Sequence, residues 1–442
     1  MKGWVVMQGK PLKMIVIAAI LAAVYGAEPL LADQFHYANL LMGDRAMGMG
    51  GAFCAVADDA SGLVYNPAGI AFAQSNEISA SGNAFYQRQQ TYKKTIGQND
   101  YLESSKGSVA PFLGSLVKLE NLAPGLAFAF GFFNRDAELK TQDDLIENEL
   151  NISRFHRTQN IRAQTGGFGV AASKRLFSSL AAGVSLSYLA VDELVQDYQD
   201  VLATVDTDDE DNIPDTPQLL TQNLRQRLEV SIVEIGMGLQ YSLLPNVSLG
   251  VNFKVPTTVS QNFENGFEQT TIQSKDGFNT ITDSISRTVA GKSKIDNPFG
   301  GLPSEYRLGL AWFASTGVLW TMDVSHYTAI KGDLDIYTRE AVTNYATGLE
   351  WYITPNVPVR FGVFTNNDAR PEIDETKTDQ ADHIDYTGYS MFFVWAQPNS
   401  QVALGGIYQG GKGKAQKIAK STAVQDVEAT SYTIAFSATQ NI

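Results

Sequence analysis

The chain has 442 residues, of which 44% are hydrophobic and 10% aromatic, and its mean hydropathy of -0.12 is mild. Its formal net charge of -14 argues against nucleic-acid binding, which requires a basic face. The single cysteine, Cys54, excludes an intramolecular disulfide framework.

The first residues have the pattern of a secretory signal peptide. Three lysines precede an apolar run over residues 14–24, and small residues follow it. The run has about eleven residues, whereas a helix needs about 20 to cross a bilayer. We therefore predict a signal peptide over residues 1–32, with a cleavage site between residues 26 and 33.

The segment over residues 43–72 is rich in glycine and alanine. Such small side chains would let the backbone pack closely against surrounding structure, as a plug must. A phosphate-binding loop is the alternative, but a third glycine is missing where Phe53 stands, and no Gly-Lys-Ser/Thr follows. We therefore predict a plug.

Three short motifs give this segment a family resemblance: MGGAF at 49–53, ADDA at 57–60 and NPAG at 66–69. Together they resemble the N-terminal hatch of the FadL/TodX family of outer-membrane channels for hydrophobic compounds. The resemblance implies a monomeric β-barrel whose hatch, over residues 33–74, folds back into the lumen. The candidate plug or gate residues are Gly50, Gly51, Phe53, Asp58, Asp59, Asn66, Pro67 and Ala68.

The Asn-Pro step in the last motif predicts a turn with a defined direction. Pro67 biases Asn66 toward the extended region, and the Asn66 side chain can then bond local backbone. Two interpretations stay open at this point: the turn is a stable structural element, or it also closes the pore.

Past residue 75, the chain repeats segments in which apolar and polar residues alternate. In residues 247–255, the odd-numbered residues are apolar and the even-numbered ones are glycine or polar. This period of two residues predicts β-strands with two different faces. A soluble β-sandwich would alternate in the same way, so the pattern alone does not decide between the two.

The connections favour a membrane barrel, because short turns alternate with long polar loops, as in outer-membrane proteins. We predict an all-β fold: a transmembrane antiparallel β-barrel of about fourteen strands over residues 75–442, with the N-terminal hatch inside its lumen. The C-terminal strand is expected to close the barrel, although Ile442 stands where the family usually has an aromatic residue. The predicted long loops cover residues 91–107, 136–155, 192–224, 256–304, 328–340, 366–384 and 409–427.

The alternation changes phase within residues 228–241. Leu228, Val230 and Ile232 share one face, whereas from Val233 onward the odd-numbered residues are apolar. A shift of one residue predicts a β-bulge in this strand. The bulge could be a bend of the barrel, or a gap through which an apolar ligand leaves sideways. The family resemblance implies a lateral opening, but does not map it to this strand.

Two of the predicted loops carry leucine, isoleucine or valine at four-residue spacing, which predicts short amphipathic helices. Such stripes occur in loop packing as well as in ligand sites. In the FadL/TodX family the third and fourth external loops carry helices that form an apolar groove, so the resemblance implies a ligand groove here. Its candidate residues are Leu219, Leu220, Leu224, Ile281, Ile285 and Val289.

An acidic run over residues 206–215 offers closely spaced carboxylates, which are suitable ligands for calcium. The weak candidate ligands are Asp206, Asp208, Asp211 and Asp215. The run lacks the spaced glycine and the distal glutamate of an EF-hand calcium loop. A solvated acidic loop is the simpler interpretation, and we predict neither another metal site nor a cofactor.

The sequence contains no catalytic constellation. His36, His156, His326 and His383 are scattered, with no His-Glu-x-x-His pair, and no Gly-x-Ser-x-Gly elbow occurs. We therefore expect no enzyme activity.

Together, the residues and the resemblance predict a bacterial outer-membrane channel for passive uptake of hydrophobic compounds, such as long-chain fatty acids or aromatic hydrocarbons. The expected partners are the hydrophobic ligand, outer-membrane lipid and lipopolysaccharide, and the barrel-assembly machinery. We expect a monomer that binds no nucleic acid. The alternative is a FadL-like barrel that acts as a shuttle or anchor in protein secretion.

Overall fold

The computed structural model describes residues 34–96, 99–149, 152–205, 216–273, 284–290, 297–333, 337–377, 380–417 and 422–442. The predicted signal peptide lies outside these residues. So do Ile281 and the calcium candidates Asp206, Asp208, Asp211 and Asp215. Those predictions stay untested.

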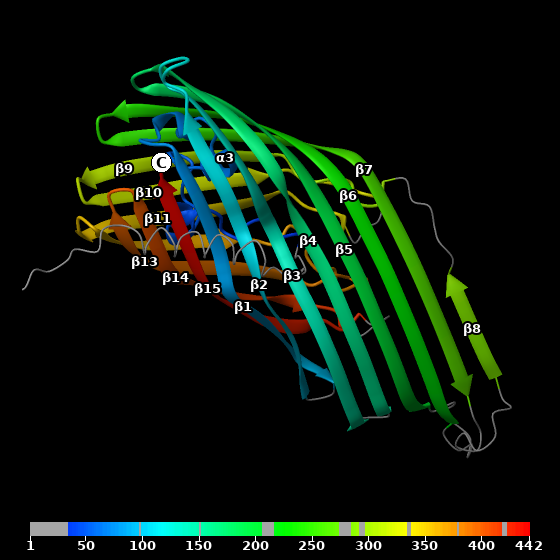
Figure 1. Cartoon of the computed structure of the whole chain (residues 1–442). Helices are drawn as coiled ribbons and strands as arrows, with labels where there is room; N and C mark the ends of the chain where they lie inside the picture. Colours follow the sequence, from blue (N-terminus) through cyan, green and yellow to red (C-terminus); the bar gives the residue numbers. More distant parts are fainter. Residues whose placement is uncertain are drawn as a thin grey trace, which may run out of the picture.

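Antiparallel strands dominate the described chain and close into a barrel (Figure 1). Fourteen of the fifteen described strands form the ring, which β1 and β15 complete, whereas β8 pairs only with the outer end of β7. The predicted all-β barrel and its closing C-terminal strand are therefore confirmed. The strands are β1 Glu77–Ile96, β2 Asn99–Lys118, β3 Leu126–Glu149, β4 Ile152–Phe177, β5 Leu180–Val205, β6 Thr216–Leu244, β7 Val247–Gln273, β8 Ser284–Ala290, β9 Glu305–Ser315, β10 Val318–Tyr327, β11 Val342–Thr354, β12 Val357–Asn366, β13 His383–Gln397, β14 Ser400–Ala415 and β15 Gln425–Asn441.

The period-two pattern of the sequence produces the two faces of the barrel. In β13, Tyr389, Met391 and Phe393 point outward and are exposed, whereas Ser390 and Phe392 between them are buried. An apolar outer face suits the hydrocarbon of a bilayer, while the inner face meets the lumen. Further exposed apolar side chains of this outer belt include Phe130, Phe132, Leu186, Ile235, Leu308, Trp395 and Ile434.

Strands β3 to β7 are longer than a bilayer requires. They have 24 to 29 residues, whereas a tilted transmembrane strand needs about 9–11. Figure 1 shows them extending together beyond the other strands.

Much of the predicted loop sequence is therefore strand. Most of 136–155, 192–224 and 256–273 belongs to β3 to β7, and most of 91–107 and 409–427 belongs to β1, β2, β14 and β15. The prediction failed because polarity on both faces indicates contact with water, and water does not prevent strands from pairing. The described residues of 328–340 and 366–384 do lie mainly outside strands, as predicted.

The predicted helices of the external region are wrong. Leu219, Leu220 and Leu224 lie on β6, and Ile285 and Val289 lie on β8. A spacing of four residues is twice the period of a strand, so it aligns side chains on a strand as well as on a helix.

The helices of the described chain are all short and all lie near the N-terminus. They are α2 Asp44–Gly48, α3 Gly62–Tyr65 and the 3-10 helix η1 Gly69–Phe72. No helix among the described residues is long and apolar enough to cross a membrane.

The bulge predicted in β6 lies instead in its neighbour β7. Ser231 pairs with Ser260 and Ile232 pairs with Thr258, so the extra residue is Val259, which is 64% exposed. Strand β6 keeps its phase, and its even-numbered residues face inward from Leu228 to Gln240. The sequence pattern changes phase because the inward-facing residues of β6 are apolar as far as Ile232 and are polar or glycine from Glu234 onward. The inward-facing Leu228, Val230 and Ile232 belong to a buried cluster that also contains Leu189 and Val191.

Candidate functional site

We refer to residues 34–76 as the N-terminal segment. It lies inside the ring of strands, where its short helices are buried (Figure 1). α2 packs against β12, β13 and β15, whereas η1 packs against β3, β4 and β5. The segment therefore contacts separate arcs of the barrel wall.

Glycines on both sides allow the N-terminal segment to approach the wall closely. Gly50 has a φ of +64°, and a Cβ atom on Gly362 of β12 would lie 2.2 Å from the Gly50 nitrogen. A Cβ atom on Gly250 of β7 would lie 2.2 Å from the carbonyl oxygen of Cys54. Contacts this short exclude any larger residue at these wall positions. The sequence motifs include the glycines of the N-terminal segment but not the wall glycines that face them.

The Asn66 side chain joins the Asn-Pro turn to the wall. Its Nδ2 donates to the carbonyl oxygens of Cys54 at 2.8 Å and of Leu239, on β6, at 3.1 Å. Its Oδ1 accepts from the Ala68 N–H at 3.1 Å. The backbone of Asn66 is extended, with φ of -162° and ψ of 106°. Both local predictions, an extended Asn66 and a bond from its side chain to nearby backbone, are confirmed.

Buried ion pairs hold α2 against the wall. Arg360 of β12 donates to Asp44 at 2.8 Å and to Glu350 of β11 at 2.7 Å. Arg45 donates to Asp58 at 2.6 Å and to Glu350 at 3.1 Å. Glu350 therefore bridges a cation of the segment and a cation of the wall.

The acidic pair that follows has two different environments. Asp58 pairs with Arg45, whereas Asp59 accepts from the backbone N–H and the hydroxyl of Ser61 at 2.8 and 2.6 Å. Burial raises the pKa of Asp59 to about 6, against the lowering effect of the Ser61 hydrogen bond. The neighbouring Ala60 N–H donates to Glu77, the first residue of β1, at 2.6 Å.

The middle of the segment is fixed by Asp323 of β10. Its Oδ2 accepts from the N–H groups of Phe53 and Cys54 at 3.0 and 2.9 Å. The Phe53 ring packs edge-on against Tyr65, with centroids 5.8 Å apart. Burial raises the pKa of the Cys54 thiol, so it remains protonated.

Thus all the predicted plug residues lie on the N-terminal segment: Gly50, Gly51, Phe53, Asp58, Asp59, Asn66, Pro67 and Ala68. The predicted groove residues on β6 and β8 lie on a separate part of the molecule.

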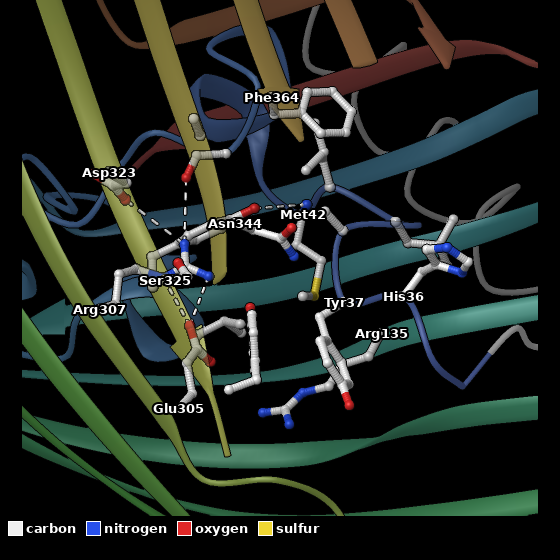
Figure 2. Close-up of a pocket in the computed structure, with 18 of the residues that line it drawn as sticks. His36, Tyr37, Met42, Arg135, Glu305, Arg307, Asp323, Ser325, Asn344 and Phe364 are labelled. Atoms are coloured by element: carbon white, nitrogen blue, oxygen red, sulfur yellow. Dashed lines mark hydrogen bonds and ion pairs between the residues drawn. The ribbon is translucent and has the colours of Figure 1, made fainter. Parts of the chain in front are cut away.

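A cavity of about 110 Å³ lies between the N-terminal segment and the wall (Figure 2). The segment contributes residues on either side of Met42, and the wall contributes residues from β3, β4, β6, β7 and β9 to β12. Its apolar lining includes Leu40, Leu41, Met42, Val64, Leu302 and Phe364.

The same cavity has a charged side. Arg135 of β3 makes a bidentate ion pair with Glu234 of β6. Lys254 of β7 donates to Glu305 at 2.8 Å, and Arg307 pairs with Glu305 at 2.7 Å. Figure 2 shows Arg307 lying between Glu305 and Asp323. Sequence reasoning missed this site, although Lys254 on the polar face of an otherwise alternating strand was a signal of it.

A cleft of about 610 Å³ opens in the wall beside this cavity. Strands β2 and β3 pair only between Phe112–Lys118 and Ala127–Phe133, although both strands continue outward. Beyond that ladder, the side chain of Asn134 donates to the Ala110 carbonyl at 2.8 Å in place of a backbone bond. The cleft is lined by Ala110, Leu113, Phe132, Phe133, Asn134, Gln164, Gly166, Gly167, Phe168, Tyr188, Ala190 and Asp192.

One short stretch of β3 separates the cleft from the cavity. Phe133 and Asn134 line the cleft, whereas Arg135 and Asp136 line the cavity. The register between β3 and β4 shifts here, because Asn134 pairs with Gly166 and Asp136 pairs with Thr165. Arg135 is therefore the extra residue of a β-bulge, the structure that the sequence had suggested for β6.

The N-terminal segment is also held at its other end. The guanidinium groups of Arg339 and Arg370 both lie over the Phe35 ring, 5.0 and 4.5 Å from its centroid. Arg339 also lies 4.4 Å from the centroid of Phe299 and donates to the Gly301 carbonyl at 3.1 Å. This stack joins the start of the segment to residues that lie between the strands.

No protein-family model matches the chain, and no curated protein matches it in sequence. Solved structures do match its fold. The toluene transporter TodX of Pseudomonas putida gives a TM-score of 0.59 at 13% identity, covering 91% of this chain and 98% of that chain. A FadL homologue of Pseudomonas aeruginosa gives 0.57 at 10% identity, covering 94% and 100%. The toluene transporter TbuX of Ralstonia pickettii gives 0.57 at 11% identity, covering 91% and 99%.

These matches cover nearly all of this chain and of each neighbour, so they include the barrel and not just a group of strands. The apolar outer belt is that of an outer-membrane barrel. The chain therefore has the fold of the FadL and TodX outer-membrane channels.

Proposed function

We propose that the protein is a bacterial outer-membrane channel for passive uptake of hydrophobic compounds. The observation that carries the proposal is that β3 separates an internal cavity from a cleft in the wall. The bulge in β3 is the boundary between an internal cavity with an apolar side and a cleft, lined by aromatic residues, in the barrel wall. The structural neighbours named as toluene transporters support the same function by analogy.

In this proposal the ligand leaves sideways, through the cleft between β2 and β3. Phe132 and Phe168 at the cleft are exposed on the outer face, so the cleft opens toward hydrocarbon. Transfer into an apolar phase is favourable by roughly 25 cal/mol per Å² of apolar ligand surface. The alternative route along the barrel axis is blocked by the N-terminal segment, whose ion pairs and hydrogen bonds to the wall would have to break.

The N-terminal segment therefore has the role of a plug in this proposal. Its Asn66 and Asp323 contacts hold the backbone against β6 and β10. We also keep the external capture of ligand as part of the proposal, now on the extended strands β6 and β8 rather than on helices. Leu224 is the described member of this surface on β6, whereas Leu219, five residues before it, lies on the opposite face of the strand.

Filling the cleft tests the lateral route. Ala190 lines the cleft and its side chain faces outward, so Ala190→Trp should obstruct it without disturbing the lumen. We expect the variant to reduce toluene uptake by cells roughly tenfold. Leu404→Trp, at an exposed outward position on β14, is the matched control and should transport like the parent.

The amount of folded barrel is measured in each case by the difference in gel migration between boiled and unboiled samples. Normal toluene uptake by a folded Ala190→Trp variant would exclude this cleft as the exit. A parent protein that does not increase toluene or fatty-acid uptake over cells without it would refute the channel itself.

A further inference from the structure

We propose that the cavity selects small uncharged hydrophobic molecules, and that Glu234 sets this selection by neutralising Arg135. The inference rests on the proposed channel function and narrows its ligand class. It starts from the charges that line the cavity, all of which come from described residues.

Every lysine and arginine among the described residues that line the cavity is already paired with a carboxylate of the same lining. Arg135 pairs with Glu234, Lys254 pairs with Glu305, and Arg307 lies between Glu305 and Asp323, at 2.7 and 3.7 Å. These three cations face four lining carboxylates, Asp136, Glu234, Glu305 and Asp323. A ligand carboxylate would therefore enter a cavity with no surplus of positive charge.

Because Arg135 and Glu234 are largely buried, a ligand carboxylate cannot easily replace Glu234 as the partner of Arg135. The side chains of Arg135 and Glu234 are 21% and 6% exposed, so water can only partly solvate either partner. A fatty-acid carboxylate could bind Arg135 only by displacing Glu234, which would leave a buried carboxylate without its partner. Removing one partner of a buried pair is strongly unfavourable because the other charge stays desolvated. An uncharged ligand has no such requirement.

The size of the cavity points to the same class. It measures about 110 Å³, somewhat less than the roughly 150 Å³ apolar cavity that accepts benzene in another protein. Leu40, Met42 and Phe364 provide apolar contacts in its lining. The cavity therefore fits a molecule of about one aromatic ring better than an extended acyl chain.

Of the three cations, Arg135 lies closest to the boundary that a ligand must cross from the cavity to the cleft, so its pairing should affect passage most directly. It is the extra residue at the β3 bulge, beside the residues that line the cleft, and Figure 2 shows it among the side chains around the cavity. If Glu234 lost its charge, Arg135 would present an uncompensated cation at this boundary. A carboxylate ligand would then gain a partner, without displacing one.

The experiment compares uptake of two probes, toluene and laurate, by cells that produce the parent or a variant. For the parent we expect a laurate-to-toluene ratio of roughly a tenth or less, because the laurate carboxylate has no available partner. Glu234→Gln keeps the size of the side chain but frees the charge of Arg135, and should raise this ratio roughly tenfold. The double variant Arg135→Gln with Glu234→Gln removes both charges and should return the ratio to that of the parent.

Glu229→Gln is the matched control. It makes the same change on the same strand, but the Glu229 carboxylate pairs with Arg227 at the surface, where both side chains are more than 40% exposed. This variant should leave the ratio unchanged. Folded amounts are again measured from gel migration with and without boiling.

The outcomes separate the two proposals. If the parent takes up laurate as well as toluene, the selection is refuted and the channel stands. If the parent selects toluene but folded Glu234→Gln keeps the parent ratio, Glu234 does not set the selection. If the parent takes up neither probe, the channel function itself fails.

Discussion

Arg360 on the barrel wall donates to Asp44 in the N-terminal segment at 2.8 Å, and their side chains are only 1% and 2% exposed. The two residues are far apart in the chain, and their pair fixes α2 to β12 at a point that water hardly reaches. Glu350 shares the same guanidinium. Arg360 therefore holds the N-terminal segment in place and also pairs with a carboxylate of the wall, so its loss should destabilise both contacts.

We predict that Arg360→Ala destabilises the protein by about 3–5 kcal/mol, because it leaves two carboxylates buried with fewer partners. The midpoint of urea unfolding in detergent micelles measures this. Arg227→Ala is the control, since it breaks an exposed pair with Glu229 that should contribute about 0–1 kcal/mol. Equal effects of the two substitutions would contradict a structural role for the buried pair.

A second prediction follows from Asp59, whose pKa burial raises to about 6. A carboxylate with a raised pKa in the folded state is unfavourable when ionised, so its cost is present above pH 6 and is relieved as the pH falls. Asp44, Asp58 and Glu77 add negative charge around it, and Arg45 opposes them. The parent should therefore gain stability between pH 8 and pH 5.

Asp59→Asn is expected to remove part of this gain. The loss is at most about 1.4 kcal/mol, because pH 5 lies about one unit below the pKa of Asp59, and it is less to the extent that water screens the half-buried side chain. The measurement is the thermal midpoint of the parent and the variant at pH 8 and at pH 5. Because Glu77 contacts the same turn, the informative quantity is the difference between the two proteins. A parent and a variant with the same pH dependence would show that Asp59 has no part in it.

The fold could be predicted from the sequence more completely than the site. Alternation fixes which side chains face lipid and which face the lumen, as in β13, and it needs no knowledge of distant contacts. The Asn-Pro turn was predictable for the same reason, since Asn66 and Ala68 interact within one turn. The strand ends were not predictable, because extended sheet and loop have similar polarity when water surrounds both.

The charged side of the cavity depends on contacts between distant strands. Arg135 meets Glu234 across 99 residues of chain, and Lys254 meets Glu305 across 51. No local pattern pairs such residues, and the bulge at Arg135 leaves no clear change of period in the sequence. The apparent phase change in β6 had a different origin, the change of its inward-facing residues from apolar to polar or glycine after Ile232.

The external capture surface gives a third prediction. Leu224 lies on the extended part of β6, opposite Asp197 of β5. Leu224→Asp should slow toluene uptake without reducing the folded protein, because a charge on an apolar docking surface must be desolvated at a cost of several kcal/mol. Asn223→Asp places the same charge on the opposite face of β6 as a control. Equal uptake by both variants would remove this surface from the mechanism.

The last prediction concerns the Asn-Pro turn as a gate. Asn66 holds the turn through two carbonyl acceptors, one of them on β6, and Pro67 fixes its own φ and keeps Asn66 extended. Replacing both, as Asn66→Ala with Pro67→Gly, removes these bonds and frees the backbone while the strands keep their ladders. If the turn closes the pore, the double variant should stay folded but conduct ions in a planar bilayer, where the parent is closed. Gln74→Ala, at an exposed position of the same segment, should remain as closed as the parent. A folded double variant with no more conductance than the parent would mean that the turn is structural and that other contacts, such as those of Arg360, keep the pore closed.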